Sequence, residues 1–385
     1  MKLAFVIQRY GLEVAGGAEA HCRGLVRALR ARHQIEVLTT CALDYITWKN
    51  HYPPGTVSID DVPVTRYLNA RERDTEQFAA ISDLVFNDDH TIDDERRWIE
   101  ENGPVSPDLI RAIGSRRDFD FIILYSYRYY TAALGAKAAA GRAVLVPTAE
   151  DDPAIRLGVF ADVFKSARGA LYLTPEEQAL IEHHTGVTDL PSAIIGSGVS
   201  VPAGITAASI GRFDLPQPYV LYAGRIDRNK GVDTLFRYYT WLADEWPDAP
   251  TLVLAGHQVL DVPTHPKLRY VGYVSEEEKA ALLAGAAVAI MPSALESLSM
   301  FVLEAWALGT PVLVNAQCRV LEGQCRRSNG GLYYRDLAEF AAMLKLMLSS
   351  PHLRADLGQA GRAYVTAEYS WEIAAERTES LLVRL

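Results

Sequence analysis

Short apolar segments alternate with longer helix-like segments along both halves of this chain of 385 residues. Most apolar segments are followed by polar or glycine-rich residues, which is typical of strands that a parallel sheet buries on both faces. This order predicts an α/β protein in which helices cover the faces of parallel sheets. The expected strands lie at 3–7, 35–39, 62–68, 121–125, 143–147, 170–173, 193–195, 219–223, 251–255, 268–271, 286–291 and 312–314.

A segment rich in glycine, alanine and proline separates the expected strands into two groups. It covers residues 200–217 and has the composition of a domain linker. A chain of this length corresponds to about two domains on the usual size range. We therefore expect one Rossmann-like domain over 1–200 and a second over 201–370.

Charge and cysteine usage exclude several classes of protein. A net charge of −10 argues against general nucleic-acid binding, which needs a basic surface. The four cysteines show no metal-ligand spacing, so we expect free thiols in a reducing compartment. Residues 1–7 are too short for the apolar part of a signal peptide, and no 18-residue run is apolar throughout. These features predict a cytoplasmic protein without a transmembrane segment.

Residues 71–117 form the most strongly charged part of the chain and read as helices joined by loops. A charged run of this kind is usually a solvated face. The alternative is an insertion that helps to bind a substrate.

Two cations follow the expected strand at 219–223. The sequence there is Gly224-Arg225-Ile226-Asp227-Arg228-Asn229-Lys230-Gly231, and a helix is expected from about Val232. Arginine offers a rigid fork to phosphate oxygens, lysine a mobile point charge, and glycine lets the backbone approach a ligand. This position favours a phosphate site over two unrelated surface cations, although the loop lacks the pattern of a P-loop NTPase.

A second candidate site lies in the segment PSALESLSMFVLEAWALGTP, residues 292–311. A helix is expected from about Ser299 to Leu308, with free N–H groups near Ser297, Leu298 and Ser299 that form an anion site. Glu296 lies in the turn and Glu304 eight residues later in the helix, where carboxylates can hold sugar hydroxyls and a ribose diol. The alternative is that Glu296 complements the helix dipole and Glu304 is solvated.

The first half of the chain offers three weaker candidates at expected strand ends. Gly16 and Gly17 open a helix whose N-terminus could receive a phosphate, or they form a flexible turn. Tyr127 and Arg128 follow the strand at 121–125, where they contact a substrate or pack between helix and sheet. Three carboxylates, which include Glu150 and Asp151, follow the strand at 143–147 and predict either a binding site or a solvated turn.

The motif GRIDRNKG, followed after some 65 residues by PSALESLSMFVLEAWALGTPV, resembles the retaining glycosyltransferases of family GT4, also called glycosyltransferase group 1. The segment VIQRYGLEVAGGAE is similar to the glycine loop of that family. The resemblance covers most of the chain and is strongest over 219–315. It implies the GT-B fold: two Rossmann-like domains face each other across a cleft, and a C-terminal helix at 371–385 crosses back to the N-terminal domain.

The resemblance further implies transfer of a sugar from a nucleotide-diphosphate sugar, bound by the C-terminal domain, to an acceptor bound by the N-terminal domain. Catalysis would rest on Arg225, Lys230 and Glu296, with no metal and no cofactor besides the sugar nucleotide as co-substrate. The anomeric configuration would be retained, and the acceptor would be a saccharide, a lipid-linked molecule or a small molecule. The implied donor-binding residues are Gly16, Gly17, Gly224, Arg225, Lys230, Val274, Glu296, Ser297, Leu298, Ser299 and Glu304.

One position departs from the family pattern. Members often carry a histidine where this chain reads Thr148-Ala149-Glu150-Asp151, so Glu150 stands near the expected histidine. This departure keeps two alternatives open: a non-catalytic or hydrolytic homologue that binds sugar nucleotides, and a sugar-nucleotide epimerase on the same fold. A dehydrogenase is disfavoured because the glycine loop is not GxGxxG. We expect the acceptor-side residues to be Glu150, Asp151, Tyr127 and Arg128.

Overall fold

The computed structural model describes residues 1–14, 16–202, 204–205, 211 and 213–385. These residues divide into two compact units: 1–198 together with 371–385, and 199–370. The predicted linker at 200–217 includes positions 203, 206–210 and 212, which lie outside the described residues. Among the described residues, no helix combines the length and apolar character that crossing a membrane requires.

Unit 1 is built on an eight-stranded sheet with the strand order β3-β4-β2-β1-β5-β6-β7-β8. Its described strands pair in parallel except for β3 and β4, which form an antiparallel hairpin at one edge. Apart from Lys2 at the start of β1, the central strands β1, β5, β6 and β7 are apolar, as the sequence predicted for a sheet covered on both faces. The strands are β1 (Lys2–Val6), β2 (Gln34–Thr40), β3 (Gly55–Ile59), β4 (Val62–Tyr67), β5 (Phe121–Tyr125), β6 (Ala143–Val146), β7 (Gly169–Tyr172) and β8 (Ser192–Ile194).

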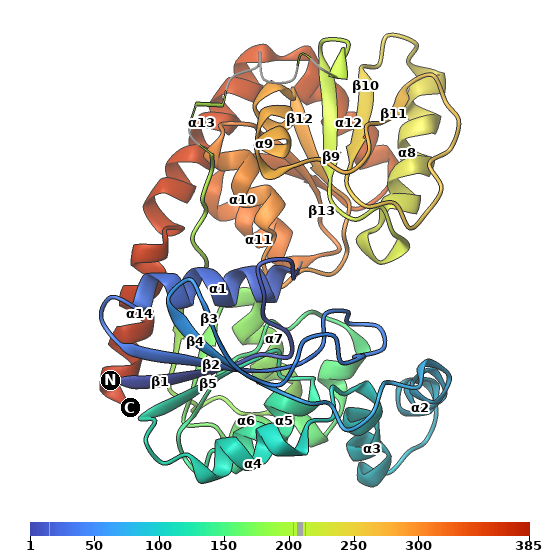
Figure 1. Cartoon of the computed structure of the whole chain (residues 1–385). Helices are drawn as coiled ribbons and strands as arrows, with labels where there is room; N and C mark the ends of the chain where they lie inside the picture. The colour runs from blue at the N-terminus through green and yellow to red at the C-terminus, as the bar shows by residue number, and fades with distance from the viewer. Residues whose placement is uncertain (15, 203, 206–210, 212) are drawn as a thin grey trace. The chain divides into compact units, whose positions relative to one another are not determined.

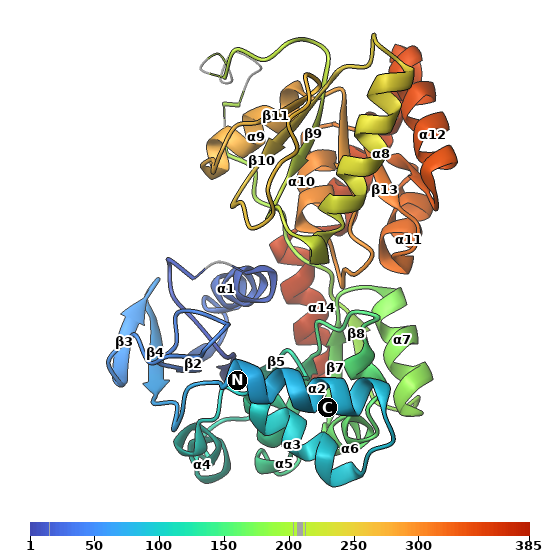
Figure 2. The same cartoon turned by 90° about the vertical axis from the view of Figure 1, so that its right-hand side faces the viewer.

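Helices pack on both faces of this sheet (Figures 1 and 2). α1 (Gly17–Leu29) packs against α14 (Trp371–Arg384), which the chain supplies after completing unit 2. The charged segment 71–117 forms three helices that carry buried residues on one side and charges on the other, so it is more than a solvated face. The remaining helices of unit 1 are α2 (Thr75–Asn87), α3 (Ile92–Asn102), α4 (Pro107–Ser115), α5 (Tyr130–Ala138), α6 (Val159–Ser166) and α7 (Pro175–Thr185).

Unit 2 has a six-stranded sheet with the order β11-β10-β9-β12-β13-β14, and its described pairs are all parallel. Its core joins α8 and α12 to one face of the sheet, and α10 packs against α9 and α13 (Figure 2). The strands are β9 (Tyr219–Ala223), β10 (Thr251–Ala255), β11 (Leu268–Tyr270), β12 (Val288–Met291), β13 (Val312–Asn315) and β14 (Gly331–Tyr334). The helices are α8 (Val232–Glu245), α9 (Glu276–Gly285), α10 (Met300–Ala307), α11 (Arg319–Ser328), α12 (Leu337–Ser349) and α13 (Pro351–Glu368).

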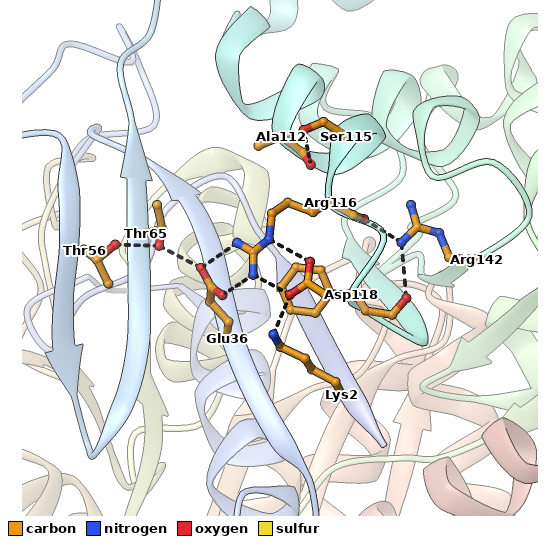
Figure 3. A network of polar contacts seen from close by, with 10 residues as sticks. Lys2, Glu36, Thr56, Thr65, Ala112, Ser115, Arg116, Asp118 and Arg142 are labelled. Atoms are coloured by element: carbon orange, nitrogen blue, oxygen red, sulfur yellow. Dashed lines mark hydrogen bonds and ion pairs between the residues drawn. The ribbon is translucent and has the colours of Figure 1, made fainter.

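A network of charges ties together the strands of unit 1 near their amino ends (Figure 3). The Arg116 guanidinium donates to Glu36 Oε2 at 3.0 Å and to Asp118 Oδ2 at 2.8 Å, and Lys2 also pairs with Asp118. Hydrogen bonds from Arg116 and Lys2 lower the pKa of the Asp118 carboxyl. These charged side chains pair with one another near the amino ends of the strands. The sequence predicted ligands at the opposite, carboxyl ends.

The first residue of α14, Trp371, is inserted between two glycines of unit 1. A Cβ on either Gly24 of α1 or Gly198 would overlap the indole ring. The ring also lies 5.6 Å from the His21 imidazole, centroid to centroid. Close to this point the chain passes between the units twice, and Val199 N–H donates to Tyr369 O at 3.2 Å. Both passages of the chain are therefore held side by side.

His21 is fully buried beside Trp371 and links three segments. Its Nε2 lies 2.8 Å from Gly196 O and its Nδ1 lies 3.0 Å from Tyr125 Oη. Burial lowers the pKa of the imidazole to about 4, against the opposing hydrogen bond to Gly196. The ring is therefore neutral near pH 7, with Nε2–H donating to the carbonyl and Nδ1 accepting from the phenol.

This burial predicts a loss of stability in acid. The unfolded chain binds a proton on His21 near pH 6.5, whereas the folded unit does so only near pH 4, so stability falls as the pH falls through this window. The full loss is about 3 kcal/mol at 1.4 kcal/mol per pKa unit. Urea unfolding of the wild type and His21→Gln at pH 7 and pH 4.5 measures it, with exposed His352→Gln as control. Equal pH dependence in wild type and His21→Gln would contradict the expectation.

Candidate functional site

The two motifs of the second half meet at the carboxyl edge of the unit 2 sheet. The loop after β9 ends at Gly231, which has φ of 69° and caps α8. A Cβ at Gly231 would overlap the backbone carbonyl of Pro292, which follows β12. Glycine is thus required here both for its backbone conformation and for the close approach of the two loops. This packing brings the expected phosphate-binding cations beside the expected sugar-binding carboxylate.

Lys230 and Glu296 form an ion pair across this contact. Lys230 Nζ lies 2.7 Å from Glu296 Oε1, and their side chains are 32% and 12% exposed. The pair joins residues 66 positions apart in the sequence. A side chain from each motif therefore contributes to one half-open polar site in unit 2.

Arg225 lies in the same loop and is oriented by two neighbours. Its Nε is 2.6 Å from Asp227 Oδ2, and its backbone carbonyl accepts a hydrogen bond of 2.7 Å from Tyr222 Oη. Asp227 also accepts the Asn229 N–H at 2.6 Å, which shapes the turn before Lys230. The Arg225 side chain is 34% exposed, so it is held in place and still open to a ligand.

The second carboxylate of the motif, Glu304, pairs with a lysine that the sequence analysis did not single out. Lys279 Nζ lies 3.0 Å from Glu304 and 2.7 Å from Glu276. Burial raises the pKa of the Glu304 carboxyl, and the charge of Lys279 opposes this effect. A Ser275–Glu278 capping box begins α9, but no sequence signal indicated that Lys279 faces Glu304.

The other predicted donor-binding residues of unit 2 lie around this edge of the sheet, but α10 begins slightly later than predicted. Helix α10 begins at Met300 with Ser299 at its N-cap position, so Ser297 and Leu298 precede the helix and their N–H groups are not in its first turn. Leu298 and Ser299 are buried, as is Val274 in the loop after β11. Gly224 directly follows β9, and the Tyr222 hydroxyl would lie 3.0 Å from a Cβ added there. The Cys318 thiol donates to Glu296 O at 3.8 Å and so supports the turn.

In unit 1 the glycine loop is already occupied by a side chain. Glu19, in the first turn of α1, is buried, and its carboxylate fills the place of a Cβ at Gly16. Arg9 Nε donates to Glu19 Oε1 at 2.9 Å and balances the charge. Gly17, the first residue of α1, has no neighbour within 4 Å of an added Cβ. Gly17 therefore leaves space for the predicted phosphate contact, whereas the space at Gly16 is filled.

The structure assigns the acceptor-side candidates to different environments. Tyr127 is 1% exposed and its ring packs edge-on against Phe160 at 4.7 Å, so this residue belongs to the core. Arg128 pairs with Asp152, the third of the three carboxylates. Asp151 is half-exposed and pairs with Arg156 at 2.9 Å. Glu150, which directly precedes Asp151 in the same loop, is partly buried. Two of the three carboxylates therefore meet arginines.

The chain is similar in sequence to known sugar transferases. The family described as "Glycosyl transferases group 1" matches residues 207–364. A Corynebacterium glutamicum protein named GDP-mannose-dependent monoacylated alpha-(1-6)-phosphatidylinositol monomannoside mannosyltransferase is 25% identical over 72% of this chain and 65% of its own length. D-inositol 3-phosphate glycosyltransferase of Streptomyces scabiei is 28% identical over 64% of this chain and 60% of its own. The chain thus spans somewhat less than two thirds of these relatives.

Solved structures share the fold over the whole chain. The match to sucrose-phosphate synthase from Thermosynechococcus elongatus has a TM-score of 0.70 at 18% identity. It covers all of this chain and 98% of the synthase chain. A trehalose-6-phosphate synthase has a TM-score of 0.74 at 12% identity, with 100% and 99% covered. The predicted GT-B fold class, with two parallel-sheet domains, is confirmed. In sequence, residues 207–364 of this chain are similar to the group 1 glycosyltransferases.

Proposed function

We propose that this protein transfers a sugar from a nucleotide-diphosphate sugar to an acceptor hydroxyl, with retention of the anomeric configuration. The Lys230–Glu296 ion pair at 2.7 Å carries the proposal, because it joins the phosphate-binding motif to the sugar-binding motif in one site. The family match and the relatives named as sugar transferases support it. An Anabaena protein of the same fold was solved with UDP bound, which fits a nucleotide donor.

The site supplies the charges that such a transfer needs. As the bond to the diphosphate breaks, negative charge grows on the leaving oxygen, and fixed cations in the site stabilise it. Lys230 and Arg225 would take this role, and we propose on this basis that no metal is required. Glu296 would hold hydroxyls of the donor sugar. Glu304, which is paired with Lys279, would accept hydrogen bonds from the ribose hydroxyls.

We propose that unit 1 binds the acceptor through the loop at 148–152 and the half-exposed Arg128. The first acceptors to test are D-inositol 3-phosphate and a phosphatidylinositol mannoside, since relatives are named for these molecules. Membrane contact would be peripheral at most. A role in glycolipid or glycoside synthesis follows from the same relatives.

A thermal-shift panel with UDP, GDP, ADP and TDP and their sugar conjugates identifies the donor. A nucleotide at a hundredfold its Kd adds about 2.7 kcal/mol of stability, and we expect Tm to rise by roughly 5–10 °C for a unit of this size. Arg225→Ala with Lys230→Ala should remove the shift, whereas Arg237→Ala, an exposed arginine of α8, should keep it. The absence of a shift with every nucleotide would refute the assignment of this site.

Product analysis with the identified donor then separates the proposed function from its alternatives. A new glycoside supports transfer. Free sugar without glycoside indicates a hydrolase, and an altered sugar on the nucleotide indicates an epimerase. Binding without any product indicates a non-catalytic homologue.

A further inference from the structure

Glu177 is a buried carboxylate that the proposed transfer does not use. It lies in the first turn of α7 and is fully excluded from solvent. Oε1 accepts the Ala149 N–H at 2.7 Å and Oε2 accepts the Leu173 N–H at 2.6 Å. Burial raises the pKa of the carboxyl, whereas the backbone N–H groups of Leu173, Ala149, Thr174 and Thr148 favour the carboxylate and oppose the shift. One side chain thus connects the segments that follow β6 and β7.

The segment that Glu177 holds after β6 has an unusual backbone. Thr148 has φ of 51°, and Ser126, at the end of the neighbouring β5, has φ of 61°. Their hydroxyl oxygens are 2.9 Å apart and hydrogen-bonded. Left-handed backbone is uncommon for residues other than glycine, and it is unusual for a β-branched threonine. Such strain persists where the surroundings impose it, and it gathers at functional sites.

The far end of the same segment is fixed as well. Asp152 pairs with Arg128 and accepts the Ala154 N–H at 3.0 Å. Glu150 and Asp151 lie between these two anchors, and the Asp151 side chain is 48% exposed. The loop at 148–152 is therefore a short bridge held at both ends, with two carboxylates in its middle.

We propose that Glu177 is the positioning residue of the acceptor loop: it fixes Thr148 and Ala149 so that Glu150 and Asp151 meet the acceptor hydroxyls. This inference rests on the proposed function. A carboxylate suits the task because it is an acceptor on both oxygens and can take N–H groups from two segments at once. A glutamine of the same shape offers one acceptor, and its amide N–H₂ would face a backbone N–H. The loop would then move while the donor site in unit 2 stays intact.

The test compares Glu177→Gln with Glu176→Gln, a partly exposed neighbour on the same helical turn. With the donor and acceptor found in the product screen, we expect the acceptor KM to rise between about tenfold and a hundredfold in Glu177→Gln. The donor KM and the rate of donor hydrolysis in water should stay within about twofold of wild type, because water needs no placement by the loop. Glu176→Gln should match wild type.

Hydrogen exchange shows whether the variant is folded. Amides of β5 should stay protected while those of Thr148 and Ala149 exchange faster. If Glu177→Gln loses protection in β5 as well, Glu177→Asp takes its place, since it keeps the charge and is expected to raise the acceptor KM less. An unchanged acceptor KM, or equal losses in transfer and hydrolysis, would overturn the positioning role. A wild-type protein that makes no glycoside would overturn the proposed function and this inference with it.

Discussion

Replacing Lys230 with alanine is expected to lower kcat of the sugar transfer between about a hundredfold and a thousandfold, the loss typical of removing one preorganised charge-stabilising donor. The ammonium lies 2.7 Å from Glu296 and is placed by the turn that ends at Gly231. Arg225, the other cation proposed to bind the diphosphate, is paired with Asp227 at 2.6 Å. Steady-state kinetics with the donor identified by thermal shift measures the loss.

Two further variants show whether charge or geometry carries the effect. Lys230→Arg keeps a cation but replaces a compact ammonium by a planar fork, so we expect partial activity. In the double variant Lys230→Ala with Glu296→Gln, the loss of transition-state stabilisation should be smaller than the sum of the losses in the two single variants. The reason is that residues in direct contact couple by about 0.5–3 kcal/mol. Wild-type kcat in Lys230→Ala would show that the cation is not part of the catalytic site.

Replacing Gly198 with alanine is expected to destabilise unit 1 by about 1–3 kcal/mol, the usual cost of overpacking a filled site. The added methyl group would overlap the Trp371 ring at several atoms. The Trp371 ring also lies close to Gly24 and 5.6 Å from His21, centroid to centroid, so it has little room to move. Urea unfolding followed by tryptophan fluorescence measures the change.

Gly114→Ala is the matched control for this substitution. Gly114 lies inside α4, and its added Cβ would have Ala138 O at an ordinary 3.6 Å. Alanine is favoured over glycine within a helix by about 1 kcal/mol, so this variant should be as stable as wild type or more so. A Gly198→Ala protein as stable as the control would mean that the Trp371 contact adapts at no cost.

The sequence was most informative where burial dictates the pattern. The strands at the centres of both sheets are continuous apolar runs, and all of them were predicted. β3 and β14 were missed for physical reasons. β3 is an exposed edge strand, Gly55–Ile59, whose turn uses Asp60 and Asp61 at φ of 52° and 60° in place of the usual asparagine and glycine. β14 begins with Gly331, and glycine is disfavoured in strands.

The candidate site likewise contains residues that the sequence predicted and contacts that it did not. The loops that carry Arg225, Lys230 and Glu296 are local in sequence, and their place at strand ends followed from the alternation of strands and helices. Contacts between distant residues carry no such signature. The Lys279–Glu304 pair and the bonds of Glu177 to Ala149 and Leu173 depend on how helices pack on the sheets. Tyr127 shows the converse, because a tyrosine at a strand end can turn inward and join the core.

The position of α14 gives the two units different histories during synthesis. Unit 2 is one continuous segment, 199–370, and can form as soon as the ribosome has released it. Unit 1 contains residues 1–198 but packs α1 against α14, which is synthesised only after unit 2. Until Trp371 arrives, the surfaces at Gly24 and Gly198 stay uncovered. The first half of the chain therefore keeps these surfaces exposed while the second half folds. A chaperone would bind the first half during this interval.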